Sequence, residues 1–240
     1  MDFLNALREV IRVTETFDIT TIRASTGQYL ISKWIYENTN IRVLIGGDGS
    51  DEATGGYRYF HNRPSPIAFH DECAKLLKEI HFFDVLRVDR GIAGNGIEAR
   101  APFLDHRFVD LYMGLDPELR CPVDGVEKWL LREAFNTGSY LPNGVLWRKK
   151  EAFSDGVSSV AKSWYKVVQE YADNKYTDEQ LIEGQAKYVH CPPPTKEALY
   201  FREVFEEFYP GTGHVIPHYW LPNWCGDIKE PSARVLDVYK

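Results

Sequence analysis

The chain has 240 residues, of which 44% are hydrophobic and 14% aromatic, enough to bury one sizeable core or two small ones. Its formal net charge is −7, whereas proteins that bind nucleic acid usually present a positively charged surface, so we expect no nucleic-acid partner. The amino terminus lacks the layout of a signal peptide, and no apolar run is long enough to cross a bilayer, so a cytoplasmic protein with no membrane partner is expected.

The amino-terminal region is predicted to form two helices. Apolar side chains recur at helical spacing between Phe3 and Ile11. Thr20 or Thr21 is expected to cap a second helix, which carries apolar side chains as far as Trp34. Both helices precede the one segment with a clear strand pattern.

That segment, residues 41–45, is an apolar run typical of a fully buried parallel strand, and it ends in the glycine-rich, acidic loop 46–52. Loops at the carboxyl ends of such strands are where open α/β sheets bind ligands. Glycines let the backbone approach a substrate, and Asp48, Asp51 and Glu52 are carboxylates that suit a hard cation such as magnesium. The alternative is an ordinary acidic turn that caps a helix through Ser50 or Asp51.

The rest of the chain is predicted to be helical, with a loop-rich end. Ser65-Pro66 is expected to break the chain before a long helix from His70 to about Arg90. From Cys191 and again from Pro210, the composition shifts to proline, glycine and aromatic residues, which indicates ordered loops and a tail on the surface. Further helices are predicted over residues 127–135, 157–172 and 196–208.

A single buried strand poses a physical problem, because its backbone groups need partners on both edges. A lone core strand among many helices is what a cut through a doubly wound domain would leave. We therefore expect one of two outcomes. Either a further part of the domain binds in trans, or this chain alone is only marginally stable.

Asp84 lies on the apolar stripe of the predicted long helix, four residues after Ile80. A buried acid needs a compensating partner, and acids in such surroundings are candidates for general acid or base catalysis. The alternative is an acid at the helix edge that pairs with Arg87 or Lys78.

Two basic residues also have structural alternatives. Lys150 stands in the charged stretch 148–151, which fits a solvated turn before a helix. Arg100 is interpreted as the partner of Glu98 or Asp105 in a structural ion pair. The four cysteines show no spacing typical of zinc or of a disulfide framework, so neither is expected. They are Cys73, Cys121, Cys191 and Cys225.

Taken together, several stretches resemble asparagine synthetase, most closely its eukaryotic type, from about Asp2 to Lys240. The family's loop typically reads Ser-Gly-Glu-Gly-Ser-Asp-Glu, and this chain differs from it at Gly46 and Asp48. The stretches that carry the resemblance are Gly46–Glu52, Gly55-Gly56-Tyr57, Tyr59-Phe60-His61, Phe83–Arg90, Glu98–His106, Trp147–Gly156 and Pro231-Ser232-Ala233-Arg234.

The resemblance implies a mostly helical α/β fold, a partial synthetase domain of the adenine-nucleotide α-hydrolase-like class of PP-loop ATP pyrophosphatases. Residues 1–190 would be the partial ATP-binding domain, and residues 191–240 the loop-rich carboxy-terminal tail of the same domain. The family's glutaminase domain, with its amino-terminal cysteine, and its Ser-Gly-Gly-x-Asp-Ser pyrophosphate loop are not found in the sequence, so we expect a partial synthetase domain.

The implied activity is ATP- and Mg²⁺-dependent conversion of aspartate to asparagine through an aspartyl adenylate, with ammonia supplied from glutamine by a glutaminase domain. A complementing chain or a homodimer would complete the site. Two alternatives stay open. One is a non-catalytic remnant that serves as an interaction module, and the other is a different adenylating amide-forming enzyme, such as a β-lactam synthetase.

The resemblance also assigns residues to the nucleotide. The backbone at Gly46 and Gly47 would contact it, with Ser50 beside them, and Asp51 would help hold magnesium and pyrophosphate.

Three residues are assigned to the chemistry. Asp48 takes the place of the loop glutamate that binds substrate or accepts a proton from ammonia. Asp84 matches an active-site acid. Lys150 matches a lysine that sits over the activated carbonyl and stabilises developing negative charge.

Overall fold

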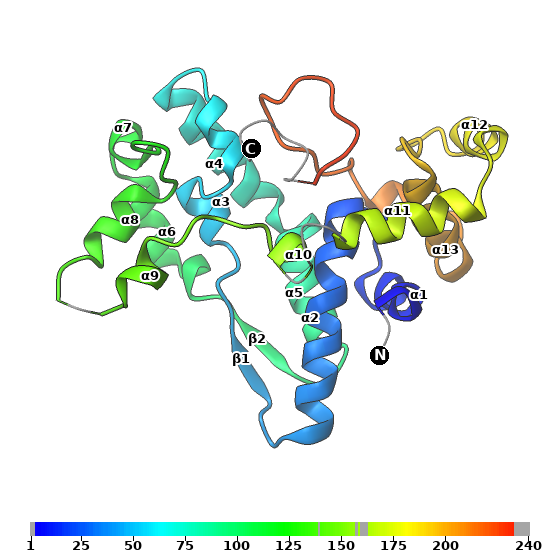
Figure 1. Cartoon of the computed structure of the whole chain (residues 1–240), viewed down its shortest axis with the longest axis horizontal. Coiled ribbons are helices and arrows are strands. Elements are labelled where there is room, and N and C mark those ends of the chain that lie inside the picture. Colours follow the sequence, from blue (N-terminus) through cyan, green and yellow to red (C-terminus); the bar gives the residue numbers. More distant parts are fainter. Residues whose placement is uncertain (1–2, 139, 157, 159–162, 233–240) are drawn as a thin grey trace.

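The computed structural model describes residues 3–138, 140–156, 158 and 163–232. A central group of three helices packs together in it, α1 (Phe3–Thr14), α2 (Ile19–Asn38) and α5 (Asp84–Ala93) (Figure 1). The first helix confirms the helical spacing seen in the sequence, because most of its apolar stripe, including Leu7 and Ile11, is buried. The mostly helical α/β class predicted from the sequence is confirmed.

The start of α2 differs from the prediction. The cap is Asp18, whose carboxylate accepts hydrogen bonds from the backbone N–H and the hydroxyl of Thr21, so Thr20 and Thr21 lie inside the helix. The same carboxylate accepts a hydrogen bond from the backbone N–H of Trp220. This buried acid therefore joins the start of α2 to the carboxy-terminal loops.

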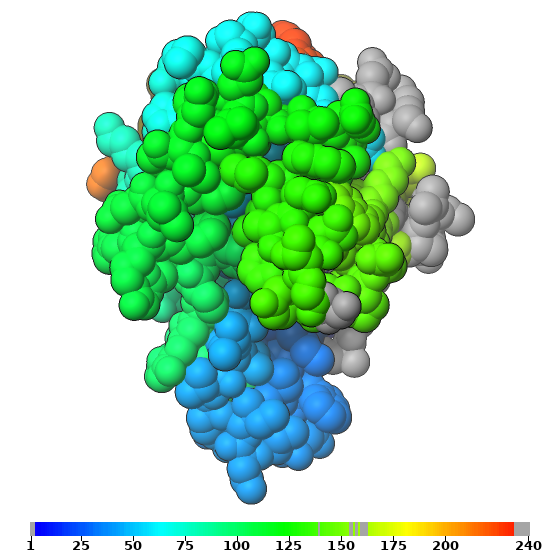
Figure 2. Space-filling view, turned by 90° about the vertical axis from the view of Figure 1, so that its left-hand side faces the viewer, coloured from blue at the N-terminus to red at the C-terminus, as the bar shows by residue number. Residues whose placement is uncertain are grey.

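The described sheet has two parallel strands, β1 (Val43–Ile45) and β2 (Glu98–Arg100). The expectation of a lone strand is wrong, because β2 pairs with β1. The sequence of β2, Glu-Ala-Arg, carries no apolar pattern, so this pairing could not be predicted from the sequence. The expectation of full burial is also wrong. Successive side chains of a strand point to opposite faces of the sheet. Leu44 therefore packs against the apolar cluster that contains Val88 and Ile92, whereas Ile45 points the other way and is 76% exposed. Figure 2 shows this blue end of α2 and β1 projecting from the body of the molecule.

The predicted long helix from His70 to Arg90 is broken. Helix α4 (Pro66–Glu79) starts four residues earlier than predicted, with Ser65 as its cap, and it passes through a 3₁₀ turn, η2 (Ile80–Phe82), before α5 begins. Phe83 leaves the helical backbone and buries its ring in the core cluster that also contains Phe69. Burial of an aromatic ring therefore outweighs continuation of the helix at this point.

Further elements flank the centre on both sides (Figure 1). On one side lie α3 (Ser50–Thr54), η1 (Arg58–Asn62), η3 (Pro102–Leu104), α6 (His106–Met113), α7 (Pro117–Arg120), α8 (Trp129–Ala134) and α9 (Asn143–Leu146). On the other lie α11 (Trp164–Lys175), α12 (Asp178–Lys187), α13 (Lys196–Phe208) and η4 (Gly213–Val215), whereas α10 (Phe153–Gly156) lies at the centre beside α2.

Helix α13 has the bounds predicted for it, and α8 is shorter than the predicted helix 127–135. The predicted helix 157–172 is described only from α11 onward, because residues 157 and 159–162 lie outside the described residues. The described helices include none long and apolar enough to cross a membrane. The division of the chain at residue 190 stays a prediction.

Candidate active site

The glycine-rich loop lies at the carboxyl end of β1. The backbone N–H of Gly46 donates to the carbonyl oxygen of Arg100 at 2.8 Å and so extends the pairing of β1 with β2 by one residue. Gly49 then adopts a left-handed backbone, with φ of 86°, as the cap of α3. Among the described residues, no side chain caps α3, so the interpretation of Ser50 or Asp51 as a helix cap is wrong. The loop carboxylates are instead turned toward other partners.

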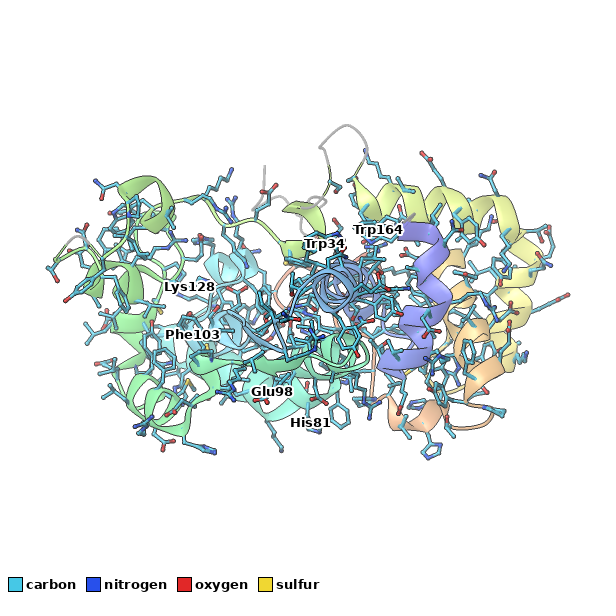
Figure 3. All side chains as sticks on the ribbon, turned by 90° about the horizontal axis from the view of Figure 1, so that it is seen from below. Trp34, His81, Glu98, Phe103, Lys128 and Trp164 are labelled. Carbon is cyan, nitrogen blue, oxygen red and sulfur yellow. The ribbon has the colours of Figure 1, made fainter. Side chains whose placement is uncertain are left out.

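Asp51 lies between two lysines. Its Oδ1 accepts a hydrogen bond from Lys128 Nζ at 2.7 Å, and its Oδ2 accepts one from Lys150 Nζ. Burial alone would raise the pKa of Asp51, but the charges of the two ammonium groups hold that pKa well below its usual range. Lys150 is therefore no solvated surface lysine, and Lys128 is a residue that the sequence did not reveal. Figure 3 labels Lys128 beside α3, the helix that carries Asp51.

Arg87 links the two predicted acids Asp48 and Asp84. Its Nη1 pairs with Asp84 Oδ1, and its Nη2 lies 3.2 Å from Asp48 Oδ1, to which Gln28 Nε2 also donates at 3.4 Å. Burial would lower the pKa of Arg87, but the charges of Asp84 and Asp48 raise it above its ordinary value, so the guanidinium stays charged. Of the two partners considered for Asp84, Arg87 and Lys78, the structure shows Arg87. Through Arg87, Asp84 is also connected to Asp48.

Glu52 and Tyr57 complete the cluster. The sequence suggested Glu52 only as a further loop carboxylate for a cation and gave Tyr57 no role. Glu52 is 2% exposed, and its Oε1 accepts a hydrogen bond from the Tyr57 hydroxyl. Burial, together with the charges of Asp84 and Asp51, raises the pKa of Glu52 well above its usual range. Glu52 was visible as part of the quoted loop, but its inward direction depends on how α3 packs.

Two cavities adjoin the cluster. The larger has a volume of about 690 Å³, within the range of roughly 300–1,000 Å³ typical of ligand pockets. The smaller has a volume of about 110 Å³. Of the predicted residues, Asp84 lines the smaller cavity, and Asp51 and Lys150 line both. The other predicted residues line the larger one: Gly46, Gly47, Asp48 and Ser50.

Arg100 does not line either cavity. It is exposed and bonds Glu98 on the same strand at 2.7 Å, as expected for a structural pair (Figure 3 labels Glu98). The four cysteines, all within the described residues, form no disulfide.

A magnesium site at Asp51 does not fit this arrangement. Both oxygens of the carboxylate face lysine ammonium groups, and the described residues contain no group of three acidic, histidine or cysteine side chains that could hold a metal ion. Two converging ammonium groups suit a phosphate better than a cation.

Comparison with known proteins gives a consistent result. A sequence model of the family described as asparagine synthase matches residues 1–68 and 65–226. The glutamine-hydrolysing asparagine synthetase of Gallus gallus is 51% identical over 237 residues, which cover 99% of this chain and 42% of that protein. The corresponding proteins of Homo sapiens and Bos taurus are 50% and 48% identical with the same coverage. The chain spans less than half the length of these relatives.

Proposed function

The chain belongs to the asparagine synthase family, and on that premise we propose that it forms the nucleotide- and aspartate-binding side of an enzyme that makes asparagine from aspartate and ATP. The observation that carries the proposal is the convergence of Lys128 and Lys150 on Asp51, at the wall of a cavity large enough for a nucleotide. The glycine loop forms another part of the same wall, where its backbone can approach the ligand.

The reaction needs activation because a carboxylate resists attack by a nucleophile. Transfer of AMP from ATP to the side-chain carboxylate of aspartate gives an aspartyl adenylate and releases pyrophosphate. Ammonia then attacks the acyl carbon, AMP leaves, and the nitrogen loses a proton. In the whole protein, the ammonia would come from glutamine.

The residues of this chain serve those steps by charge and position. Lys150 stabilises the negative charge that develops on the departing pyrophosphate and on the tetrahedral intermediate. Lys128 adds a second cation, which is bound to the other oxygen of Asp51. Asp48 faces the larger cavity, where it binds the substrate or takes the proton from nitrogen. Arg87 holds Asp48 and Asp84 in fixed positions.

A chimera tests this proposal. The matching part of the Gallus gallus enzyme is replaced by this chain, and asparagine formation is measured with ATP, magnesium, aspartate and glutamine. We expect activity, and we expect Lys150→Ala to lower kcat by about 10²–10³-fold, the typical effect of losing one donor that stabilises a transition state.

Lys149→Ala is the matched control, because this neighbouring lysine is exposed and lines neither cavity of the cluster. It is expected to leave kcat unchanged. A folded chimera without activity, or equal effects of the two alanine variants, would contradict the proposal.

A further inference from the structure

Arg132 on α8 lies outside the charged cluster and lines neither of its two cavities, and its side chain is only 13% exposed. Its Nε donates to the carbonyl oxygen of Glu127 at 2.9 Å, and its Nη2 donates to a carboxylate oxygen of the same residue at 3.1 Å. Its Nη1 donates to the carbonyl oxygens of Leu146 and Arg148. A planar guanidinium group can make such bonds in several directions at once. One side chain therefore connects the segment before α8 with the end of α9 and the residues after it.

Each of the two connected segments leads to a lysine of the cluster. Glu127 directly precedes Lys128, and Arg148 stands two residues before Lys150. The two lysines bind different oxygens of Asp51, whose helix, α3, lies far from both of them in the sequence. The relative positions of the two ammonium groups therefore depend on how the two segments are held together, and the guanidinium group bonds both segments.

The backbone of Lys128 is held from both sides. Lys128 adopts a left-handed conformation, with φ of 58°, which is unfavourable for a residue with a Cβ atom. The carbonyl oxygen of the preceding peptide group accepts from Arg132 Nε, and that of the following peptide group accepts from the backbone N–H of Arg132 at 2.9 Å. Because each peptide group is planar, fixing both of them fixes the two backbone angles between them. Arg132 therefore stabilises the strained backbone that directs the Lys128 side chain toward Asp51.

The Glu127 carboxylate anchors the guanidinium group in the protein interior. Glu127 is 4% exposed, and its other carboxylate oxygen lies 3.9 Å from His61 Nε2. Burial would raise the pKa of Glu127, but His61 and the charge of Arg132 hold that pKa below its usual range. The acid therefore stays ionised and keeps the guanidinium group in place.

We propose that Arg132 is a positioning residue that holds Lys128 and Lys150 in the one arrangement in which both ammonium groups meet the phosphate groups of a nucleotide. It acts through the two lysines and does not itself contact the ligand. Arg132→Lys preserves the charge beside Glu127, but a single ammonium group cannot reach both segments in the same geometry. This inference rests on the proposed function, which makes a nucleotide the ligand of the two lysines.

Chemical labelling of the full chain without nucleotide tests the positioning directly. Acetic anhydride modifies exposed lysines, whereas Lys128 and Lys150 are 18% and 16% exposed and are bound to Asp51. Arg132→Lys is expected to raise the acetylation rates of both lysines about tenfold relative to exposed Lys149, the typical effect of losing one hydrogen bond to a charged group. The rates are measured by peptide mass spectrometry, and the free energy of unfolding is measured to show that each variant is folded.

Arg202→Lys is the matched control. Arg202 is also buried, pairs with Glu206 and donates to the carbonyl oxygen of His190, yet it lines neither cavity of the cluster. Its replacement is expected to lower the free energy of unfolding, as Arg132→Lys does, but to leave both acetylation rates unchanged. If Arg132→Lys does not fold, Glu127→Gln combined with Arg132→Met removes both charges together and is expected to give the same increase in labelling.

Isothermal titration with ATP separates positioning from direct contact. Arg132→Lys is expected to raise the Kd for ATP about tenfold in the parent chain. In a Lys128→Ala and Lys150→Ala double variant, it is expected to change that Kd by about twofold at most, because Arg132 acts through these lysines.

Three results would overturn the inference: unchanged labelling in Arg132→Lys, equally raised labelling in Arg202→Lys, or the full effect on the Kd for ATP in the variant without the two lysines. Faster labelling in Arg132→Lys together with no ATP binding by the parent chain would instead count against the proposed function and leave the positioning role supported.

Discussion

Replacing Gly46 by alanine tests whether the loop geometry positions Asp48. A Cβ atom at residue 46 would lie 2.7 Å from Asp48 Oδ2, closer than such contacts occur, whereas a Cβ atom at Gly47 would meet nothing within 4 Å. Neither glycine requires a left-handed backbone, so the two substitutions differ mainly in this contact. Gly47→Ala is therefore the matched control.

The added methyl group is expected to push the Asp48 carboxylate away from Arg87 and Gln28, which hold its Oδ1 at 3.2 and 3.4 Å. Loss of a hydrogen bond to a charged group is worth about 1.5–3 kcal/mol. A displacement of about 1 Å in an organised site costs on the order of a hundredfold in rate. We therefore expect Gly46→Ala to lower kcat of the chimera by about 10–100-fold, and Gly47→Ala to leave it within twofold of the parent, about 0.4 kcal/mol.

The assay is the initial rate of asparagine formation, with the free energy of unfolding measured for each variant to separate misfolding from misplacement. The loop typical of the family pairs serine at this position with the longer glutamate, so Gly46→Ser combined with Asp48→Glu is expected to recover activity that Gly46→Ser alone loses. Equal rates for the two alanine variants, or no recovery in the double variant, would refute the reasoning.

Three further predictions concern stability, each measured by denaturant unfolding. Burial raises the pKa of Asp18 to about 6, although the hydrogen bonds to its carboxylate lower it, so Asp18 stays protonated to a higher pH in the folded chain than in the unfolded chain. As the pH rises from about 4 to about 6, this difference lowers the free energy of unfolding by about 3 kcal/mol. Asp18→Asn should abolish this pH dependence. Arg23→Met leaves buried Glu197 without its cation and is expected to cost about 3–5 kcal/mol, whereas Arg8→Met, which breaks an ion pair at the surface, should cost no more than about 1 kcal/mol; similar losses would contradict the assignment. Ile45→Lys is expected to change little in this chain but to cost about 2 kcal/mol or more in the chimera, where the remaining part covers β1; equal effects would mean that this edge is not a packing surface.

The sequence predicted elements whose signals are local. Helices α1 and α13 carry apolar side chains at helical spacing, and Thr195 supplies a side-chain cap directly before α13. The break at residues 80–83 has no glycine or proline to announce it, because it results from burial of Phe83. Strand β2 is defined by its pairing with β1 and has no pattern of its own.

The site shows the same division. The acidic loop, Asp84 and Lys150 were found because they stand in recognisable stretches, and the structure brings them together with Asp51 at the centre. Lys128 could not be found in this way, because it lies 77 residues from Asp51 in the sequence and adopts a left-handed backbone in a turn before α8. The pairing of Arg87 with Asp48 was hidden as well, since only the fold brings Asp48 close to α5.

The most direct test of the account is aspartate-dependent exchange of labelled pyrophosphate into ATP by the chimera, measured without glutamine or ammonia so that only adenylation is observed. We predict exchange that requires aspartate, falls at least about a hundredfold in Lys150→Ala and is unchanged in Lys149→Ala. No exchange by a folded chimera that binds ATP, or exchange that persists without aspartate or is insensitive to Lys150→Ala, would contradict the assignment of this cluster to aspartate activation.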